Sequence, residues 1–236
     1  MAGIIKRNIP NTITCCNLVS GCVATVCALN YNQELALLFI VIGAVFDFFD
    51  GMSARLLHVS SPIGKELDSL ADDITFGLAP AAMVYATLST MEYPQMLDAY
   101  RPFIPYSAFI MAAFAALRLA KFNLDERQAT SFIGLPTPAN ALFWGSLIVG
   151  APGLLESSSY MLAGVLAMVL LSSYAMVAEI PMFAMKFKTW GWKGNEVKYI
   201  FIFTCIPLLL VFRLSAFAVI IAWYVILSVV TNKISG

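Results

Sequence analysis

Long apolar runs joined by short polar connections make up the chain from one end to the other. The runs are continuous and do not alternate with polar residues, so they predict helices, whose backbone satisfies its own hydrogen bonds within lipid. A helix needs about 20 mostly apolar residues to cross a bilayer. We therefore expect an all-α, polytopic membrane helix bundle, formed by a single domain over residues 1–236. The eight expected spans are residues 13–29, 34–56, 67–88, 103–122, 132–149, 160–183, 197–212 and 214–230.

The two ends of the chain each admit an alternative. Lys6 and Arg7 precede the first apolar run, as in a secretory signal peptide, but the runs that follow favour a first transmembrane helix. Only Arg213 separates the last two runs, so they form either two spans or one bent hairpin.

Composition leads to the same class of protein. Hydrophobic residues make up 60% of the chain and charged residues 12%, with a mean hydropathy of +0.82. A soluble domain, by comparison, has about a quarter of its residues charged. The net charge is zero and the sequence has no basic block, which argues against nucleic acid as a partner. The five cysteines lie within apolar runs, form no CxxC pair, and are expected to pack as small apolar residues.

The basic residues divide unevenly between the two sides that these spans would create. Loops on the cytoplasmic side of a membrane collect Lys and Arg. With both termini on one side, the other side receives only Arg101 and Arg213. The remaining twelve are Lys6, Arg7, Arg55, Lys65, Arg118, Lys121, Arg127, Lys186, Lys188, Lys193, Lys198 and Lys233. This division predicts a multi-pass protein of the cell membrane with its N-terminus in the cytoplasm.

The segment DFFDGMSARLLHVSSPIGKELDSLADD, residues 47–73, places carboxylates at the ends of two apolar runs on the predicted cytoplasmic side. Asp47 and Asp50 are three residues apart and Asp68 and Asp72 are four apart, so each pair shares one helix face. The connection between the pairs is short and contains proline and glycine. We therefore expect two neighbouring antiparallel helices whose four carboxylates converge on one pocket.

Acids within a membrane are costly, and they mark functional sites. Four facing carboxylates repel one another unless they are protonated or neutralised. A cluster of oxygen ligands without His or Cys suits a hard divalent cation, Mg²⁺ or Mn²⁺. Four negative charges match two such ions, and two-metal sites stabilise the attacking and leaving oxygens of phosphoryl transfer. The acidic residues thus predict a site for two divalent cations.

Small residues lie between the two acidic pairs. Gly51, Ala54 and Gly64 leave backbone that a flat ligand can approach closely, and Arg55 can pair with a phosphate or brace an aspartate. Alternatively, the small residues serve no ligand and let membrane helices pack closely against one another.

These residues also form an ordered pattern, D-x2-D-G-x2-A-R-x8-G-x3-D-x3-D, which begins at Asp47 and ends at Asp72. At every position the pattern resembles the signature of the CDP-alcohol phosphotransferase family. The resemblance implies an integral membrane enzyme that moves a phosphatidyl-type group from a CDP-linked donor to an alcohol and releases CMP. It also implies a homodimer with a six-helix catalytic core, to which two helices are added here.

The family's site residues carry over by position. The ligands of the two divalent cations would be Asp47, Asp50, Asp68 and Asp72, and Asp72 would also be the general base for the alcohol. The residues that line the CDP site would be Gly51, Ala54, Arg55 and Gly64.

Four further stretches resemble the phosphatidylserine synthase branch of the family. They are IPNTITCCNLVSG, ADDITFGLAPA, LRLAKFN and FIGLPTPANA, and the C-terminal third of the chain matches more loosely. This branch implies CDP-diacylglycerol and L-serine as substrates, with phosphatidylserine and CMP as products. No Ser, Cys or His stands out as a covalent nucleophile, so we expect direct attack of the serine hydroxyl on phosphorus.

The acceptor pocket is predicted from charge. A serine carboxylate needs a cation, and Arg118 and Lys121 lie three residues apart on one helix face, while Asn17 and Asn123 can add neutral hydrogen bonds. The alternative for the two cations is contact with water or lipid phosphates at the interface. Glu179 faces either the same cavity or an interfacial lysine.

Other functions fit the sequence less well. Glycerol 3-phosphate or an inositol phosphate as acceptor would need a denser basic cluster than Arg118, Lys121 and Arg127 provide. An intramembrane prenyltransferase carries its acidic motifs on distant helices. A cation transporter often places its acids near the membrane midplane, in repeated and broken helices. This chain has its acids at one face and no second copy of them.

Overall fold

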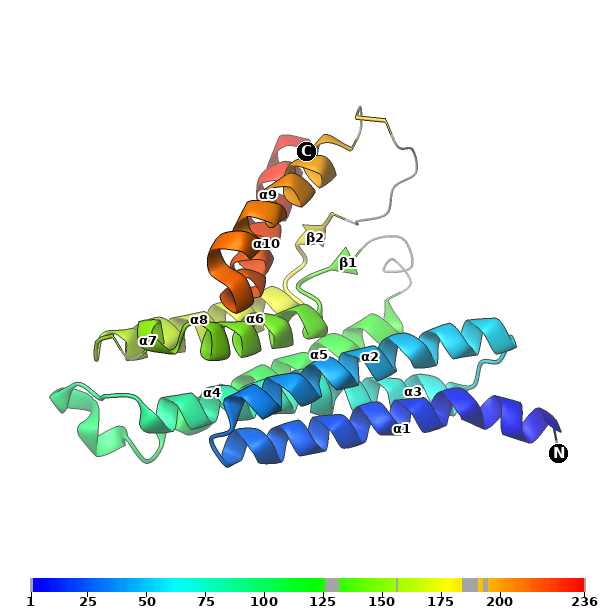
Figure 1. The fold of residues 1–236 in the computed structure, drawn as a ribbon, viewed down its shortest axis with the longest axis horizontal. Coiled ribbons are helices and arrows are strands. Elements are labelled where there is room, and N and C mark those ends of the chain that lie inside the picture. Colours follow the sequence, from blue (N-terminus) through cyan, green and yellow to red (C-terminus); the bar gives the residue numbers. More distant parts are fainter. Residues whose placement is uncertain (1, 126–131, 156, 184–190, 193–194, 236) are drawn as a thin grey trace.

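A computed structural model describes residues 2–125, 132–155, 157–183, 191–192 and 195–235, and nearly all of them lie in helices (Figure 1). The longer helices are α1 (Ala2–Leu29), α2 (Gln33–Leu57), α3 (Pro62–Asp72), α4 (Ala79–Thr90), α5 (Ile110–Leu124), α6 (Thr137–Gly150), α8 (Met161–Val177), α9 (Glu196–Phe212) and α10 (Ala216–Ser235). Short elements are the π-helix η1 (Asp73–Leu78), the 3-10 helices η2 (Gln95–Tyr100), η3 (Ile104–Phe109) and η5 (Arg213–Ser215), and α7 (Pro152–Leu155). Two strands, β1 (Phe132–Ile133) and β2 (Pro181–Met182), pair in antiparallel fashion.

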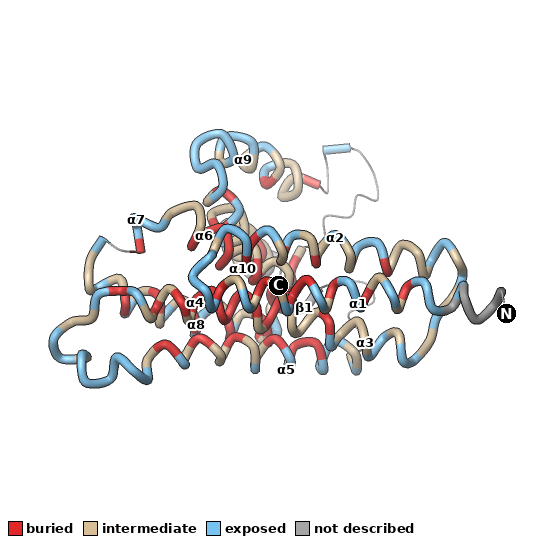
Figure 2. Tube along the Cα trace, turned by 60° about the horizontal axis from the view of Figure 1, so that its bottom comes forward, coloured by how far each residue is buried: buried red, intermediate tan, exposed pale blue. Residues whose placement is uncertain are grey.

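The helices α1 to α5 form a layer of roughly aligned rods, with α6 and α8 lying against it (Figure 1). Within this layer α1 runs along α2 and also packs against α3, η1 and α4, while α5 packs against η1 and α8. The buried residues gather where these helices meet, whereas α9 is largely exposed (Figure 2). The hairpin of α9 and α10 contacts α6 and stands steeply against the other helices (Figure 1).

The expected fold class is confirmed. Four described stretches are long and apolar enough to cross a bilayer, and Met161–Val177 is a shorter apolar helix. These stretches are Asn8–Leu29, Gln33–Leu57, Ile104–Leu124 and Glu196–Thr231. The last one contains the turn η5. Its two halves are therefore the separate helices α9 and α10, which together form a hairpin. The protein is a polytopic, helical membrane protein.

Several expected helix ends were wrong, and proline and glycine explain them. The fifth span was expected from residue 132, but α6 begins only at Thr137, because Gly134 takes a φ of +74° and Pro136 is extended. The sixth was expected to reach residue 183, but α8 ends at Val177, and Pro181 opens the strand β2. The third span is one continuous helical stretch that changes from α3 to the π-helix η1 and then to α4.

Two glycines bring three elements unusually close beside the acidic stretch. A Cβ atom on Gly21 of α1 would lie 2.7 Å from the Cα of Thr75 in η1, and one on Gly43 of α2 would lie 2.5 Å from its Cγ2. The side chain of Thr75 is fully buried, and its hydroxyl donates to the backbone carbonyl of Asn17 at 3.0 Å. Larger residues at either glycine would force α1, α2 and η1 apart.

Candidate active site

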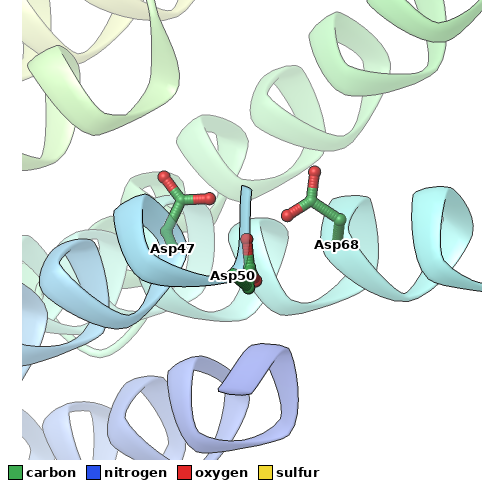
Figure 3. A group of neighbouring side chains, drawn as sticks. All are labelled: Asp47, Asp50 and Asp68. Carbon is green, nitrogen blue, oxygen red and sulfur yellow. The ribbon is translucent and has the colours of Figure 1, made fainter. Parts of the chain in front are cut away.

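Three carboxylates from two helices meet at one point of the structure. Asp47 and Asp50 lie on α2 and Asp68 lies on α3, and ligand oxygens from the three lie within 4.8 Å of one another. Their carboxyl groups turn toward a common space, with Asp50 between the other two (Figure 3). We refer to Asp47, Asp50 and Asp68 as the carboxylate triad.

The local sequence of α2 explains this arrangement. Phe48 and Phe49 separate the two acids of α2, and their side chains are 60% and 43% exposed. Asp50, by contrast, is buried, with 5% exposure. Because residues three apart share a helix face, α2 presents its carboxylates to the protein and its phenyl rings to the surroundings.

The triad fits a divalent cation. The Oδ1 atom of Asp68 is buried and has no hydrogen-bond partner among the described residues. Buried polar atoms are nearly always satisfied, so an orphaned carboxylate oxygen beside two other carboxylates is an arrangement that a cation would complete. Three oxygen donors without His or Cys form the ligand set that Mg²⁺ and Mn²⁺ prefer.

Asp72 lies one helical turn beyond Asp68 on α3. Its Oδ1 accepts a hydrogen bond of 3.1 Å from Nδ2 of Asn17, and its carboxylate interacts electrostatically with Asp47 and Asp68. The fourth predicted acid is therefore close to the triad. The helix α1 packs against both α2 and α3, and α2 also contacts η1 and α4, which continue α3 along the chain.

The helix α1 contributes a residue that the sequence reasoning missed. Thr14 is buried, and its hydroxyl lies 2.6 Å from Oδ2 of Asp50 and 3.0 Å from the carbonyl of Pro10. Thr14 and Asn17 are three residues apart, so one face of α1 supports both Asp50 and Asp72. The only signal for Thr14 was its place in the stretch IPNTITCCNLVSG, and this stretch carries no charge.

Replacing Thr14 with valine is expected to lower activity and divalent-cation affinity by roughly tenfold, since residues that orient metal ligands typically contribute about 10–100-fold. The valine keeps the shape of the side chain and removes the hydrogen bond to Asp50. Thr25→Val is the matched control, because the Thr25 hydroxyl donates to the backbone carbonyl of Gly21, within its own helix. Titration of Mn²⁺ against each purified variant measures the effect. Equal affinities in the Thr14 and Thr25 variants would contradict it.

A cavity of about 220 Å³, here called the donor cavity, opens beside the triad. It is lined by Pro10, Asn11, Thr14, Asp50, Gly51, Ala54, Val59, Ser60, Ser61, Gly64, Lys65 and Asp68. Three of the residues expected to contact CDP, Gly51, Ala54 and Gly64, are therefore together at this wall. A Cβ atom on Gly51 would meet nothing within 4 Å, so the backbone there is accessible. Arg55, the fourth expected residue, is exposed and lies outside this lining.

A second cavity, of about 390 Å³, lies between the ends of α5 and α8 and is here called the acceptor cavity. It is lined by Arg118, Lys121, Leu124, Asp125, Ile133, Met176, Val177, Ala178 and Glu179. Arg118 is 7% exposed, its Nε has no hydrogen-bond partner among the residues that the structure describes, and its guanidinium interacts electrostatically with Asp72. The predicted pair Arg118 and Lys121 thus shares one cavity next to the fourth acid.

The two predicted asparagines differ in their surroundings. Asn17 is fully buried beside Asp72. Asn123 instead links α5 to α3 by two hydrogen bonds. Its side-chain Nδ2 donates to the Ser69 hydroxyl at 2.8 Å, and its backbone carbonyl accepts from Nζ of Lys65 at 2.9 Å. Arg127, weighed in the sequence as a third cation here, lies outside the described residues.

Comparison with known proteins places this site in a family. The sequence profile of the CDP-alcohol phosphatidyltransferase family matches residues 7–171, well over half of the chain. The chain belongs to this family. The matched region contains the carboxylate triad, Asp72, the donor cavity and the α5 side of the acceptor cavity.

Three curated relatives share one enzyme name. The CDP-diacylglycerol–serine O-phosphatidyltransferase of Bacillus subtilis is 42% identical over 131 residues, which cover 55% of this chain and 69% of the relative. The enzyme of the same name from Helicobacter pylori strain 26695 is 31% identical over 230 residues, covering 94% of this chain and 89% of the relative. The Saccharomyces cerevisiae enzyme is 36% identical over 142 residues, covering 53% of this chain and 48% of the relative.

Proposed function

We propose that this member of the CDP-alcohol phosphatidyltransferase family transfers the phosphatidyl group of CDP-diacylglycerol to L-serine, giving phosphatidylserine and CMP. The observation that carries the proposal is the carboxylate triad, with oxygens within 4.8 Å of one another, beside a donor cavity and close to Asp72, which interacts with the buried Arg118 of the acceptor cavity. The names of relatives that align with most of the chain support serine as the acceptor.

The donor cavity would receive the nucleotide and diphosphate. Gly51, Ala54 and Gly64 offer a wall without bulky side chains, which lets a flat base or a diphosphate approach the backbone. Lys65 at the same wall can pair with a phosphate oxygen, and Arg55 can reach one from the exposed end of α2. The exposed Phe48 and Phe49 side of α2 leaves the acyl chains of the donor in lipid.

The metal ligands would be Asp47, Asp50, Asp68 and Asp72, which we propose hold two divalent cations, Mg²⁺ or Mn²⁺. Four carboxylates carry a charge that two such ions balance. When bound, the ions supply positive charge against the diphosphate and the departing CMP oxygen. The hydroxyl of Thr14 orients Asp50 for this role, and the amide of Asn17 orients Asp72.

Asp72 would also be the general base. In the proposed step the serine hydroxyl oxygen bonds to the phosphorus that carries diacylglycerol, the bond from that phosphorus to the CMP oxygen breaks, and Asp72 takes the hydroxyl proton. A serine hydroxyl is a weak acid, so the positions of hydroxyl and carboxylate matter as much as basicity. Arg118 interacts with Asp72 and lines the acceptor cavity, so an acceptor bound to Arg118 lies next to the base.

Acceptor binding by Arg118, Lys121, Asn17 and Asn123 remains part of the proposal. Within the described part of the chain, Nε of Arg118 has no hydrogen-bond partner, and Lys121 lines the same cavity. Asn17 would contact the acceptor beside Asp72. Asn123, which donates a hydrogen bond to Ser69 of α3, would support the acceptor site from that position.

We also propose a homodimer in the cytoplasmic membrane, with the N-terminus and the active site on the cytoplasmic side. The uneven division of Lys and Arg supports this orientation. Exposed apolar side chains such as Leu210 and Val211, at 77% and 72%, leave surface on α9 for lipid or for a second copy.

A comparison of acceptors tests the function. Purified protein is supplied with CDP-diacylglycerol and Mn²⁺ in detergent micelles, and CMP release is followed with L-serine, glycerol 3-phosphate, inositol phosphate or ethanolamine. We expect rapid release with serine and slow release with the others. Release with glycerol 3-phosphate alone would end the serine assignment, and uptake of Mn²⁺ into proteoliposomes without CMP release would favour a transporter.

A further inference from the structure

A third cavity, of about 700 Å³, lies at the end of the helices away from the carboxylates and is here called the distal cavity. It opens between the α1–α2 turn, the last turns of α4 and α6, and α7, toward the left of Figure 1. The rise along α2 from Glu34 in its wall to Asp47 of the triad is roughly 20 Å, so the distal cavity is separate from the active site. Its volume is within the range of about 300–1,000 Å³ that is usual for small-molecule sites.

The polar part of its wall is rich in hydrogen-bond acceptors. Oε1 of Gln33 is buried and has no hydrogen-bond partner among the described residues. The hydroxyls of Thr87 and Thr90 already donate to backbone carbonyls of α4, each at 2.9 Å, so toward a guest they can only accept. Glu34 adds an exposed carboxylate, and the described lining residues include no Lys, Arg or His. A buried acceptor without a donor points to a guest that donates hydrogen bonds.

The helix ends at the distal cavity favour a positive guest. The last turns of α4 and α6 contribute Thr90 and Val149 to its wall. A helix C-terminus carries roughly half a negative charge, which favours cations. The N-terminus of α2 has the opposite polarity, but it is capped by Asn32, whose side chain accepts from the amide of Leu35 at 3.2 Å. With the carboxylate of Glu34, the cavity therefore suits a cationic hydrogen-bond donor such as a primary ammonium group.

An exposed apolar stripe leads from the distal cavity along α2. Leu38, Val41 and Val45 follow Glu34 at intervals that keep them on one helix face. Each of the three is at least 40% exposed, within a helix that is long and apolar enough to cross a bilayer. Tyr31, which lines the cavity and is exposed, is a residue type that is typical of the membrane–water interface. The cavity and the stripe together match a polar head group followed by an acyl chain.

We propose that the distal cavity binds an aminophospholipid of the phosphatidylethanolamine type, with its ammonium group held by Gln33 and Glu34 and an acyl chain on the apolar stripe of α2. The site goes beyond the proposed function, because none of these residues takes part in the proposed transfer. The phosphate of the lipid stays at the rim, where Asn30 and Asn32 are exposed and carry amide donors.

The same features select against other occupants. The quaternary ammonium group of phosphatidylcholine cannot donate a hydrogen bond, so it leaves Oε1 of Gln33 without a partner. Phosphatidylglycerol carries a negative charge and no cation, and it would face the carboxylate of Glu34. Free ethanolamine fits the polar wall but leaves the apolar stripe uncovered.

Lipid binding to the purified full-length protein tests the proposal without any turnover. Delipidated protein is titrated with phosphatidylethanolamine, phosphatidylcholine or phosphatidylglycerol of the same acyl composition, and native mass spectrometry counts the bound lipid. We expect phosphatidylethanolamine to bind about tenfold more tightly than either of the others, since only its head group gives charge-assisted hydrogen bonds. Free ethanolamine at the same concentration should displace none of it. Equal or tighter binding of either other lipid, or displacement by free ethanolamine, overturns the proposal.

Three variants test whether the lipid binds at the distal cavity. Glu34→Gln should weaken phosphatidylethanolamine binding by about tenfold and leave phosphatidylcholine binding unchanged. Gln33→Glu adds a carboxylate on a side chain of the same size and should strengthen binding, a gain that structural damage would not produce. Asp98→Asn is the matched control, because Asp98 is an exposed acid in η2 and is not among the residues that line the distal cavity. If either Glu34→Gln or Gln33→Glu behaves as Asp98→Asn does, the proposal fails, whichever acceptor the enzyme uses.

Discussion

Replacing Asp72 with asparagine is expected to abolish turnover while nucleotide binding stays measurable. Asparagine keeps the size of the side chain, and its carbonyl oxygen can still accept the hydrogen bond from Asn17. It cannot take a proton from the acceptor hydroxyl, and general bases contribute about 10²–10⁴-fold to rate. Removal of one carboxylate next to the triad adds to the loss, because fewer negative charges remain to hold divalent cations.

Asp73→Asn is the matched control for Asp72→Asn. Asp73 is the adjacent acid, and a Cβ atom on Gly77 would lie 2.7 Å from its Oδ1 and 2.9 Å from the Cβ of Ala115, so Asp73 faces α5. CMP release gives the rate, and binding of a radiolabelled CDP-diacylglycerol analogue gives the affinity. Retention of full activity by Asp72→Asn would remove Asp72 as the base, and an equal loss in Asp73→Asn would point to general damage.

Replacing Asp68 with asparagine is expected to remove divalent-cation binding, and activity with it. Asp68 supplies the orphaned oxygen of the triad, and it is the one triad member on α3. Because changes to residues that merely orient metal ligands cost about 10–100-fold, loss of a ligand should cost more than about a hundredfold in affinity. Equilibrium dialysis with Mn²⁺ counts the bound ions independently of turnover.

Two controls accompany the Asp68 experiment. Glu66→Gln removes an exposed carboxylate from the same helix and should leave the number of bound Mn²⁺ ions unchanged. Treatment of the unmodified protein with a chelator should stop CMP release, and added Mn²⁺ should restore it. An Asp68→Asn variant that binds as many ions as the unmodified protein would contradict a metal role for the triad.

The carboxylate triad could be predicted because its geometry follows from spacing along single helices. Asp47 and Asp50 share a face of α2 by their separation of three residues, and the proximity of Asp68 follows from the short connection. The position of Gly51 and Gly64 at a cavity beside the acids follows in the same way.

The support from α1 could not be predicted. Thr14 and Asp50 are 36 residues apart in sequence, and Asn17 and Asp72 are 55 apart. Which face of an apolar helix meets these acids depends on how three helices pack, and no spacing within α1 reveals it. Glu179 was weighed in the sequence for the acceptor cavity and does line it. Helix ends were harder to predict, because proline and glycine interrupt the apolar runs around residues 134–136 and 178–181.

The close crossing at Gly21, Gly43 and Thr75 has a consequence for how substrates enter. It packs α1, α2 and η1 closely together about one turn from the carboxylates, so these helices hold the acids from a tightly packed level. Toward the α2–α3 connection the two glycines differ: Gly51 borders open space, whereas a Cβ atom on Gly64 would lie 3.0 Å from Oδ1 of Asn11 in α1. We therefore expect a bulky nucleotide to enter at the Gly51 side, where no close helix contact has to separate, while the reacting groups stay in place.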